Sequence, residues 1–333
     1  MGASFHDAAG EKLIRTDDRL QMRWQVIIIE PREQFDDCRV SHRFMSGFLC
    51  PIFQVYASGC RIGKMDGQLV LSLFPGIGLL DRAFRESGFC VVTGPDLIIG
   101  GDVREFAATS GKFDGVVGGP PCQGFSRANR HANDPSHHSV VNSRAMVGEF
   151  LRIVSEASPT WFLMENVPCV PDVRIDGYEV QRFGLTAPEC GLPAQLRNRH
   201  FQFGHRDGWV VRPARQTVTH RKKPGVVARA VTTKSNSART RVSDVAKRQG
   251  VTDLELPGWT KTAKIKAIGN GVPIPMGRVL AAAVSNAAPR DAADCPCNCG
   301  RRITGRQRSA TAACRKRLQM ARLGRRDVIT LRH

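Results

Sequence analysis

The chain has 333 residues, of which 41% are hydrophobic and 24% are charged, as in an ordinary folded protein with one main domain and smaller attachments. The net charge of +19 and the pI near 10.1 are unusual, and they favour a polyanionic partner such as nucleic acid over a merely solvated basic surface. We find no stretch near the ~20 apolar residues of a membrane span and no secretory signal, so we expect a cytoplasmic protein without membrane contact. Eleven cysteines in a chain of this length predict reduced thiols rather than a disulfide scaffold.

The first 64 residues show no clear hydrophobic period. Three interpretations of residues 1–64 stay open: a small domain, an extension of low order, or an overlong start.

From Leu69 onward, short apolar runs alternate with helical patterns. The predicted strands are 69–74, 90–94, 115–119 and 161–166, and the predicted helices are 79–87 and 144–157. This rhythm is typical of a doubly wound α/β sheet, which binds ligands beyond the carboxyl ends of its strands.

A glycine loop, FPGIG at Phe74 to Gly78, follows the first predicted strand. Its glycines would let the backbone approach a ligand beside a helix N-terminus, although a simple tight turn or a nicotinamide site has the same pattern. Asp96 and Asp102 follow the second strand, where each would either accept hydrogen bonds from a ribose hydroxyl and an adenine amine or merely end a strand or open a turn.

The segment GGPPCQGFS, Gly118 to Ser126, follows a buried strand directly. Its two prolines fix a rigid, extended turn that presents Cys122 outward. A lone cysteine is more often a buried core residue, but this setting favours a functional thiol.

Three further motifs follow in order: ENV at Glu165 to Val167, QLRNR at Gln195 to Arg199, and GNGVP at Gly269 to Pro273. Together with the glycine loop and the Pro-Cys motif, they give the chain a resemblance to the cytosine-5 DNA methyltransferase family, and to its small bacterial and phage members. The resemblance covers roughly residues 65–286. It implies a Rossmann-like methyltransferase domain that uses S-adenosylmethionine, with a small basic target-recognition region.

The resemblance assigns two groups of residues. The cofactor residues would be Phe74, Gly76, Gly78, Asp96, Asp102, Pro120 and Asn270, and the catalytic residues would be Cys122, Glu165, Arg197 and Arg199.

The catalytic residue types suit methyl transfer to carbon 5 of cytosine, a carbon too weakly nucleophilic to attack a sulfonium methyl group. The Cys122 thiolate would first add to carbon 6 of the ring, while Glu165 protonates or hydrogen-bonds N3. Arg197 and Arg199 alternate on an extended segment, so both are expected to face one side and hold the cytosine carbonyl oxygen or a phosphate. The sequence does not identify the base that removes the carbon 5 proton.

The implied partner is double-stranded DNA with the target cytosine flipped out of the helix. A catalytic loop at Ser126 to Ser143 would close over the base. We expect a monomer in a bacterial cell, or phage-encoded in the host cytoplasm, with a separate restriction endonuclease as a candidate partner.

The sequence divides into a catalytic domain at 65–204, a recognition region at 205–262, a segment at 263–288 that completes the catalytic domain, and a basic tail at 289–333. It departs from the family in three places. The recognition region is short for the family, so we expect a short target site. Only nine residues separate Val167 from Gly177, which predicts that a helix is lost there, and Ala194 is an extra residue before the QLRNR motif.

The tail contains four cysteines, Cys295, Cys297, Cys299 and Cys314, amid many arginines. They loosely resemble the ligands of small zinc-binding modules, although Ala310 stands where such modules often place another cysteine. The tail is therefore either a zinc module or a metal-free basic segment, and both would add salt-sensitive DNA affinity.

Two rival functions remain at this stage. A tRNA cytosine-5 methyltransferase would use the same chemistry on RNA, and a catalytically silent DNA-binding regulator would bind without turnover.

Overall fold

The computed structural model describes residues 67–193, 195–216, 228–229, 241–323 and 327–331. All of them belong to one compact unit, residues 62–333. The predicted extension at residues 1–64, Ala194 and much of the basic recognition region lie outside the described residues.

A six-stranded mixed sheet forms the centre of this unit, with strand order β2-β1-β3-β4-β8-β6. The four predicted strands are confirmed, within one residue at each end. The strands are β1 (Leu69–Leu73), β2 (Cys90–Thr93), β3 (Gly115–Gly118), β4 (Trp161–Asn166), β6 (Glu179–Thr186) and β8 (Asn198–His205). Their apolar, β-branched and aromatic side chains suit a sheet that is covered on both faces.

The strand register brings the ends that carry the predicted motifs to one edge of the sheet. β1, β3 and β4 run parallel, so that Leu73 pairs with Gly118 and Gly118 pairs with Met164. β8 runs antiparallel to β4, and Asn166 pairs with His200 near the beginning of β8. The carboxyl ends of three strands therefore meet the amino end of β8, which is where α/β sheets bind ligands.

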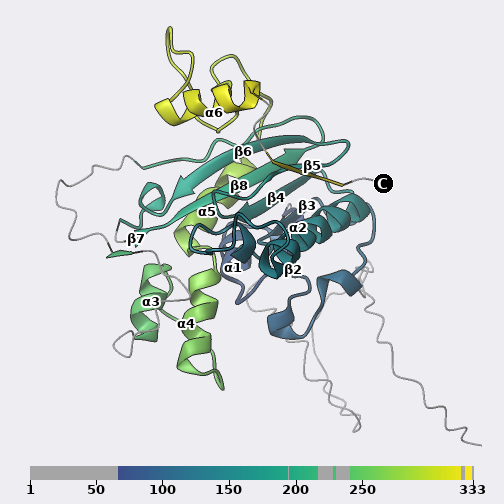
Figure 1. Ribbon diagram of the computed structural model, residues 1–333, viewed down its shortest axis with the longest axis vertical. Coiled ribbons are helices and arrows are strands. Elements are labelled where there is room, and N and C mark those ends of the chain that lie inside the picture. Colours follow the sequence, from purple (N-terminus) through teal and green to yellow (C-terminus); the bar gives the residue numbers. More distant parts are fainter. Residues whose placement is uncertain (1–66, 194, 217–227, 230–240, 324–326, 332–333) are drawn as a thin grey trace, which may run out of the picture. The chain divides into compact units, whose positions relative to one another are not determined.

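Helices cover both faces of the sheet (Figure 1). On one face lie α1 (Leu79–Glu86) and α5 (Ile274–Ser285), which bury Phe84 and Leu280 in one apolar cluster. α1 and α5 approach closely, because a Cβ placed on Gly277 would lie 2.5 Å from the Cβ of Ala83.

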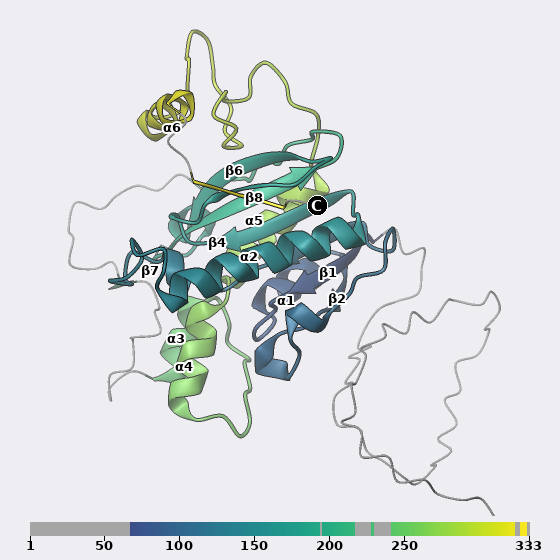
Figure 2. The same ribbon diagram turned by 45° about the vertical axis from the view of Figure 1, so that its right-hand side comes forward.

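The other face is covered by α2 (His138–Ala157), which lies across the sheet in Figure 2 and buries Phe150 and Val154. α2 begins six residues before the predicted helix. The His137 side chain caps it, since the imidazole Nδ1 accepts a hydrogen bond from the Ser139 amide at 3.3 Å.

Two further helices, α3 (Val242–Arg248) and α4 (Lys261–Asn270), pack beside the start of α1. Residues 261–285 are long and apolar enough in composition to pass for a membrane-spanning helix. They form two separate helices, α4 and α5, and 67% of the most apolar window is buried inside the protein. This is the pattern of core helices.

The remaining elements are short. They are β5 (Asp172–Arg174), β7 (Gln195–Leu196), β9 (Ala228–Arg229), β10 (Val328–Thr330), the helix α6 (Ala312–Arg322), and the 3₁₀ turns η1 (Leu97–Ile99), η2 (Val103–Glu105), η3 (Gln123–Phe125) and η4 (Pro188–Cys190). The strand β5 occupies the short interval after Val167, where the sequence predicts the loss of a helix. The end of the chain returns to this place, because β10 pairs with β5 in parallel.

Candidate active site

The glycine loop between β1 and α1 has a backbone that only a few residue types tolerate. Phe74, Gly76 and Gly78 all have positive φ angles, of 54°, 58° and 72°. A Cβ placed on Gly76 or Gly78 would meet nothing within 4 Å, so these backbone atoms face open space at the edge of the sheet. The cradle is therefore suited to a ligand that packs directly against the backbone, as the predicted cofactor would.

The two predicted acidic cofactor residues occupy different surroundings. Asp96 lies at the glycine loop, where its carboxylate accepts hydrogen bonds from the amides of Gly76 at 2.9 Å and Ile98 at 2.8 Å. Asp102 caps η2 and pairs with Arg104 at 2.5 Å, and this hydrogen bond lowers the pKa of the Asp102 carboxyl group. Asp96 is thus tied to the glycine loop, whereas Asp102 is engaged by a surface arginine.

The Pro-Cys motif follows the buried strand β3, as predicted, and is fixed by neighbours on both sides. The side-chain amide of Asn166 donates to the carbonyl of Pro120 at 3.0 Å, and the Gly124 amide donates to the Ser143 hydroxyl at 2.9 Å. A Cβ on Gly124 would lie 2.5 Å from the Ser139 carbonyl oxygen, so only glycine fits there. Cys122 therefore sits on a turn braced by β4 and α2.

Glu165, at the end of β4, lies next to this turn. Its carboxylate pairs with Arg199 Nε at 2.8 Å, and a Cβ on Gly119 would lie 3.1 Å from its Oε2. Burial raises the pKa of Glu165, against the opposing charges of Arg199 and Arg197. Burial also raises the pKa of Cys122, and the neighbouring Glu165 adds to that effect. The Cys122 thiol and the Glu165 carboxyl group therefore both retain their protons more readily than exposed groups would.

Arg197 has a position that the sequence did not predict. The expectation was that Arg197 and Arg199 face one side and hold the cytosine. The buried guanidinium of Arg197 donates to the carbonyls of Gly269 and Gly271, both at 2.8 Å, and of Asn270 at 3.3 Å. Burial lowers the pKa of Arg197 to about 9. Arg197 thus fastens the junction of α4 and α5 to the sheet, and its charge also acts on Glu165 and Cys122. Its contact with the cytosine stays a prediction.

Asn270 is one of the cofactor residues that the resemblance implies. It is the exposed last residue of α4, and its backbone carbonyl is what Arg197 contacts.

We expect Arg197→Met to lower the free energy of unfolding by about 3 kcal/mol, because three backbone carbonyls lose a buried donor. Arg82→Met is the matched control, since Arg82 forms partly exposed ion pairs with Glu86 and Asp253 and its loss should cost less than ~1 kcal/mol. Urea denaturation followed by circular dichroism measures both. Equal losses would contradict a clamping role for Arg197.

Two bracing residues escaped the sequence analysis. Asn166 stands at the end of an otherwise apolar strand, and its full burial there is a signal that its amide has a fixed partner. Ser143 gives no such signal, because the predicted helix begins only at residue 144 and Ser143 reads as the last residue of a polar loop.

The family model described as C-5 cytosine-specific DNA methylase matches residues 69–255, which is more than half of the chain. Type II methyltransferase M.AgeI from Thalassovita gelatinovora is 29% identical over 195 residues, covering 47% of this chain and 44% of that protein. Type II methyltransferase M.FnuDI from Fusobacterium nucleatum is 32% identical over 168 residues, covering 41% and 46%.

A solved structure, the Entamoeba histolytica methyltransferase EhMeth, matches with a TM-score of 0.46 and 12% identity, covering 64% of this chain and 96% of that one. In its matches with the two type II methyltransferases, the chain spans less than half of each relative's length. The matched residues include the glycine loop, the Pro-Cys turn, Glu165 and Arg199. The chain belongs to the C-5 cytosine-specific DNA methylase family.

Proposed function

We propose that this protein transfers a methyl group from S-adenosylmethionine to carbon 5 of cytosine in DNA, through a covalent adduct with Cys122. The observation that carries the proposal is the meeting of Cys122, Glu165 and Arg199 at one edge of the sheet, beside an open glycine cradle. Family membership implies the cofactor. When bound, it supplies an electrophilic methyl group.

The chain's own residues would prepare the cytosine ring. Cys122 loses its proton to solvent and its sulfur forms a bond with carbon 6, while Glu165 donates its proton to N3. The ring electrons then make carbon 5 nucleophilic, so that it can take the methyl group that the cofactor would supply, with the electrons of the broken sulfur–methyl bond remaining on sulfur. After carbon 5 has lost its proton, the Cys122–carbon 6 bond breaks and N3 returns its proton to Glu165. Arg199 orients the Glu165 carboxyl group through their 2.8 Å contact, and Asn166 holds the turn of Cys122.

The glycine cradle, from Phe74 to Gly78, would hold the cofactor. Asp96 fixes the cradle through the Gly76 amide and keeps acceptor capacity for a hydroxyl group. For Asp102 and Asn270, the predicted cofactor contacts stay predictions.

The DNA would lie across the loop that follows Cys122. Arg127 and Arg130 are exposed there, and within the described residues neither forms an ion pair. Free guanidinium groups beside a nucleophile suit the phosphates that flank an extruded base. The monomeric state, the cytoplasmic location and a separate endonuclease stay predictions.

The experiment is to express the protein in a methylation-deficient bacterial host and to sequence its plasmid DNA and its tRNA after bisulfite treatment. We expect 5-methylcytosine in one short DNA motif. Methylation of tRNA without DNA would select the RNA enzyme instead, and DNA binding by the soluble protein with neither product would support a silent regulator.

We expect the double variant Arg127→Ala/Arg130→Ala to reduce the slope of log affinity for a DNA duplex against log salt concentration by about 2, because two phosphate contacts are lost. Fluorescence anisotropy at several salt concentrations measures the slope. Arg82→Ala is the control, since this arginine is already paired with two carboxylates. An unchanged slope in the double variant would place the DNA elsewhere.

Membership of the family does not imply a zinc ion in the tail. The catalytic mechanism proposed here does not use zinc, and the zinc site of the tail stays a prediction.

A further inference from the structure

The tail folds around its four cysteines. Cys295, Cys297 and Cys299 alternate in one turn, whose sharp bend uses positive φ angles at Asn298 (57°) and Gly300 (69°). Cys314 comes from the first turn of α6, where Thr311 caps the helix by accepting a hydrogen bond from the Cys314 amide at 3.1 Å. Cys299 and Cys314, which are 15 positions apart in the chain, are thereby brought together.

The spacing of the four sulfur atoms suits a shared metal ion. All four lie within 4.8 Å of one another, and the pairs Cys295–Cys297 and Cys299–Cys314 are each 3.6 Å apart. Four thiolates at the usual zinc–sulfur distance of about 2.3 Å form a tetrahedron with edges of about 3.8 Å. A disulfide would require about 2.0 Å.

Apart from these cysteines, the described part of the tail buries almost no apolar side chains of its own. Among its described residues, the buried apolar side chains are Cys295, Cys299 and Cys314. Segments shorter than about 40 residues rarely bury enough surface to hold a fold without a metal, a disulfide or a partner.

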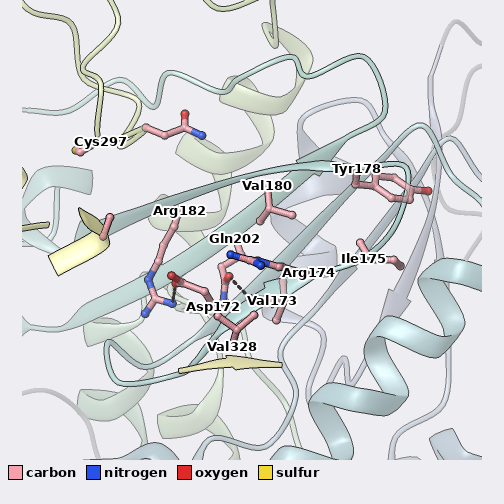
Figure 3. Close-up of a pocket in the computed structure, with 12 residues that line it drawn as sticks. Asp172, Val173, Arg174, Ile175, Tyr178, Val180, Arg182, Gln202, Cys297 and Val328 are labelled. Carbon is pink, nitrogen blue, oxygen red and sulfur yellow. Dashed lines mark hydrogen bonds and ion pairs between the residues drawn. The ribbon is translucent and has the colours of Figure 1, made fainter. Parts of the chain in front are cut away.

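The packing of this tail against the sheet is also incomplete. Cys295, Cys299 and Cys314 join the apolar cluster of the sheet, but a cavity of about 510 Å³ lies beside them, lined by Cys297 and Asn298 on the tail side and by Val180, Arg182 and Gln202 on the sheet (Figure 3). On the sheet side of the cavity, Arg182 pairs with Asp172 at 2.6 Å. A cross-link within the tail would add stability that its own few buried side chains do not supply.

Hydrogen-bond donors surround the sulfur atoms. The Ala310 amide donates to Cys295 Sγ at 3.3 Å, the Thr311 hydroxyl to Cys314 Sγ at 3.0 Å, and Arg317 Nη1 to Cys297 Sγ at 3.5 Å. Such donors stabilise thiolates and fix metal ligands from outside the coordination shell. Ala310, which stands where a further cysteine was expected, thus contributes its backbone amide.

We propose that Cys295, Cys297, Cys299 and Cys314 bind one Zn²⁺ ion that holds the tail together. Four thiolates in a tetrahedral arrangement select zinc among the common divalent ions, and a closed site with no open position has a structural role. The ion joins the cysteine turn to α6 and releases the thiol protons on binding.

The test begins with the zinc content of the full-length protein, purified without chelator and measured by elemental mass spectrometry. We expect about one zinc ion per chain in the wild type and less than about a tenth of that in Cys314→Ser and Cys297→Ser. Cys169→Ser is the matched control, because Cys169 is exposed and lies outside the cluster, and it should keep the full zinc content. Equal zinc contents in all four proteins would overturn the proposal.

A second measurement uses the wild type alone and so does not depend on the folding of a variant. After zinc removal, Co²⁺ should produce the absorption of a tetrahedral thiolate complex, and limited proteolysis within residues 295–314 should become faster and slow again when Zn²⁺ is added. Absence of both responses, or an intact mass that shows two disulfides in the freshly purified chain, would contradict a zinc site.

Discussion

Replacement of Cys122 by alanine should abolish methyl transfer, with a loss on the order of 10⁴-fold or more in the single-turnover rate, because a covalent nucleophile has no substitute in the site. The turn itself should persist, since its contacts with Asn166 and Ser143 do not involve the thiol. The measurement is the transfer of labelled methyl groups from S-adenosylmethionine to duplex DNA that contains the motif found by sequencing.

Cys169→Ser is the control for loss of a thiol and should retain wild-type activity. DNA with 5-fluorocytosine at the target adds a direct test. Its carbon 5 carries fluorine in place of hydrogen, so no base can remove a proton there, the Cys122–carbon 6 bond cannot break by elimination, and the adduct accumulates. The wild type should form a denaturant-resistant complex with this DNA, and Cys122→Ala should not. A complex with the variant would assign the nucleophile to another residue.

Replacement of Glu165 by glutamine should lower the rate by about 10² to 10⁴-fold, the usual contribution of a positioned general acid. Glutamine keeps the size of the side chain and a hydrogen bond with Arg199, but it cannot give a proton to N3. The comparison of kcat/KM for the two proteins measures this loss. Glu105→Gln, an exposed change on η2, is the control and should keep the wild-type rate.

The same variant should change the pH dependence. Burial raises the pKa of both Glu165 and Cys122, and the two groups act in opposite protonation states. The wild-type rate should rise with pH as Cys122 loses its proton, and fall with pH as Glu165 loses its own. In Glu165→Gln the fall at high pH should disappear while the rise remains. A persistent fall would assign the acid to a different group.

The strands and first helices from Leu69 to Asn166 were predictable because their signals are local. Each strand is a short apolar run, and each is bounded by glycine, proline or a charged residue within a few positions. The motifs at the strand ends then had to share one edge of a parallel sheet, which is why Cys122 and Glu165 were expected together. The same reasoning failed at the start of α2, where a histidine cap set the boundary.

Arg197 shows what local patterns leave out. Its alternation with Arg199 predicted that both arginines hold the cytosine, but nothing indicated that Arg197 also donates to backbone carbonyls 72 to 74 residues further along the chain. Every residue has a backbone carbonyl, so the sequence does not indicate which carbonyls Arg197 contacts. The pairing of β10 with β5 was equally unpredictable, since two strands of three residues each have no pattern of their own.

The tight contact between α1 and α5 has a consequence for how the protein is made. The apolar face of α1 is synthesised about 200 residues before the helix that covers it, and at 5 to 20 residues per second the ribosome needs about 10 to 40 s to supply that helix. During this interval Leu80 and Ala83 lack the cover that α5 gives them at Gly277 in the finished protein. Its folding in the cell is therefore timed by translation and open to chaperone binding until Ser285 has left the exit tunnel.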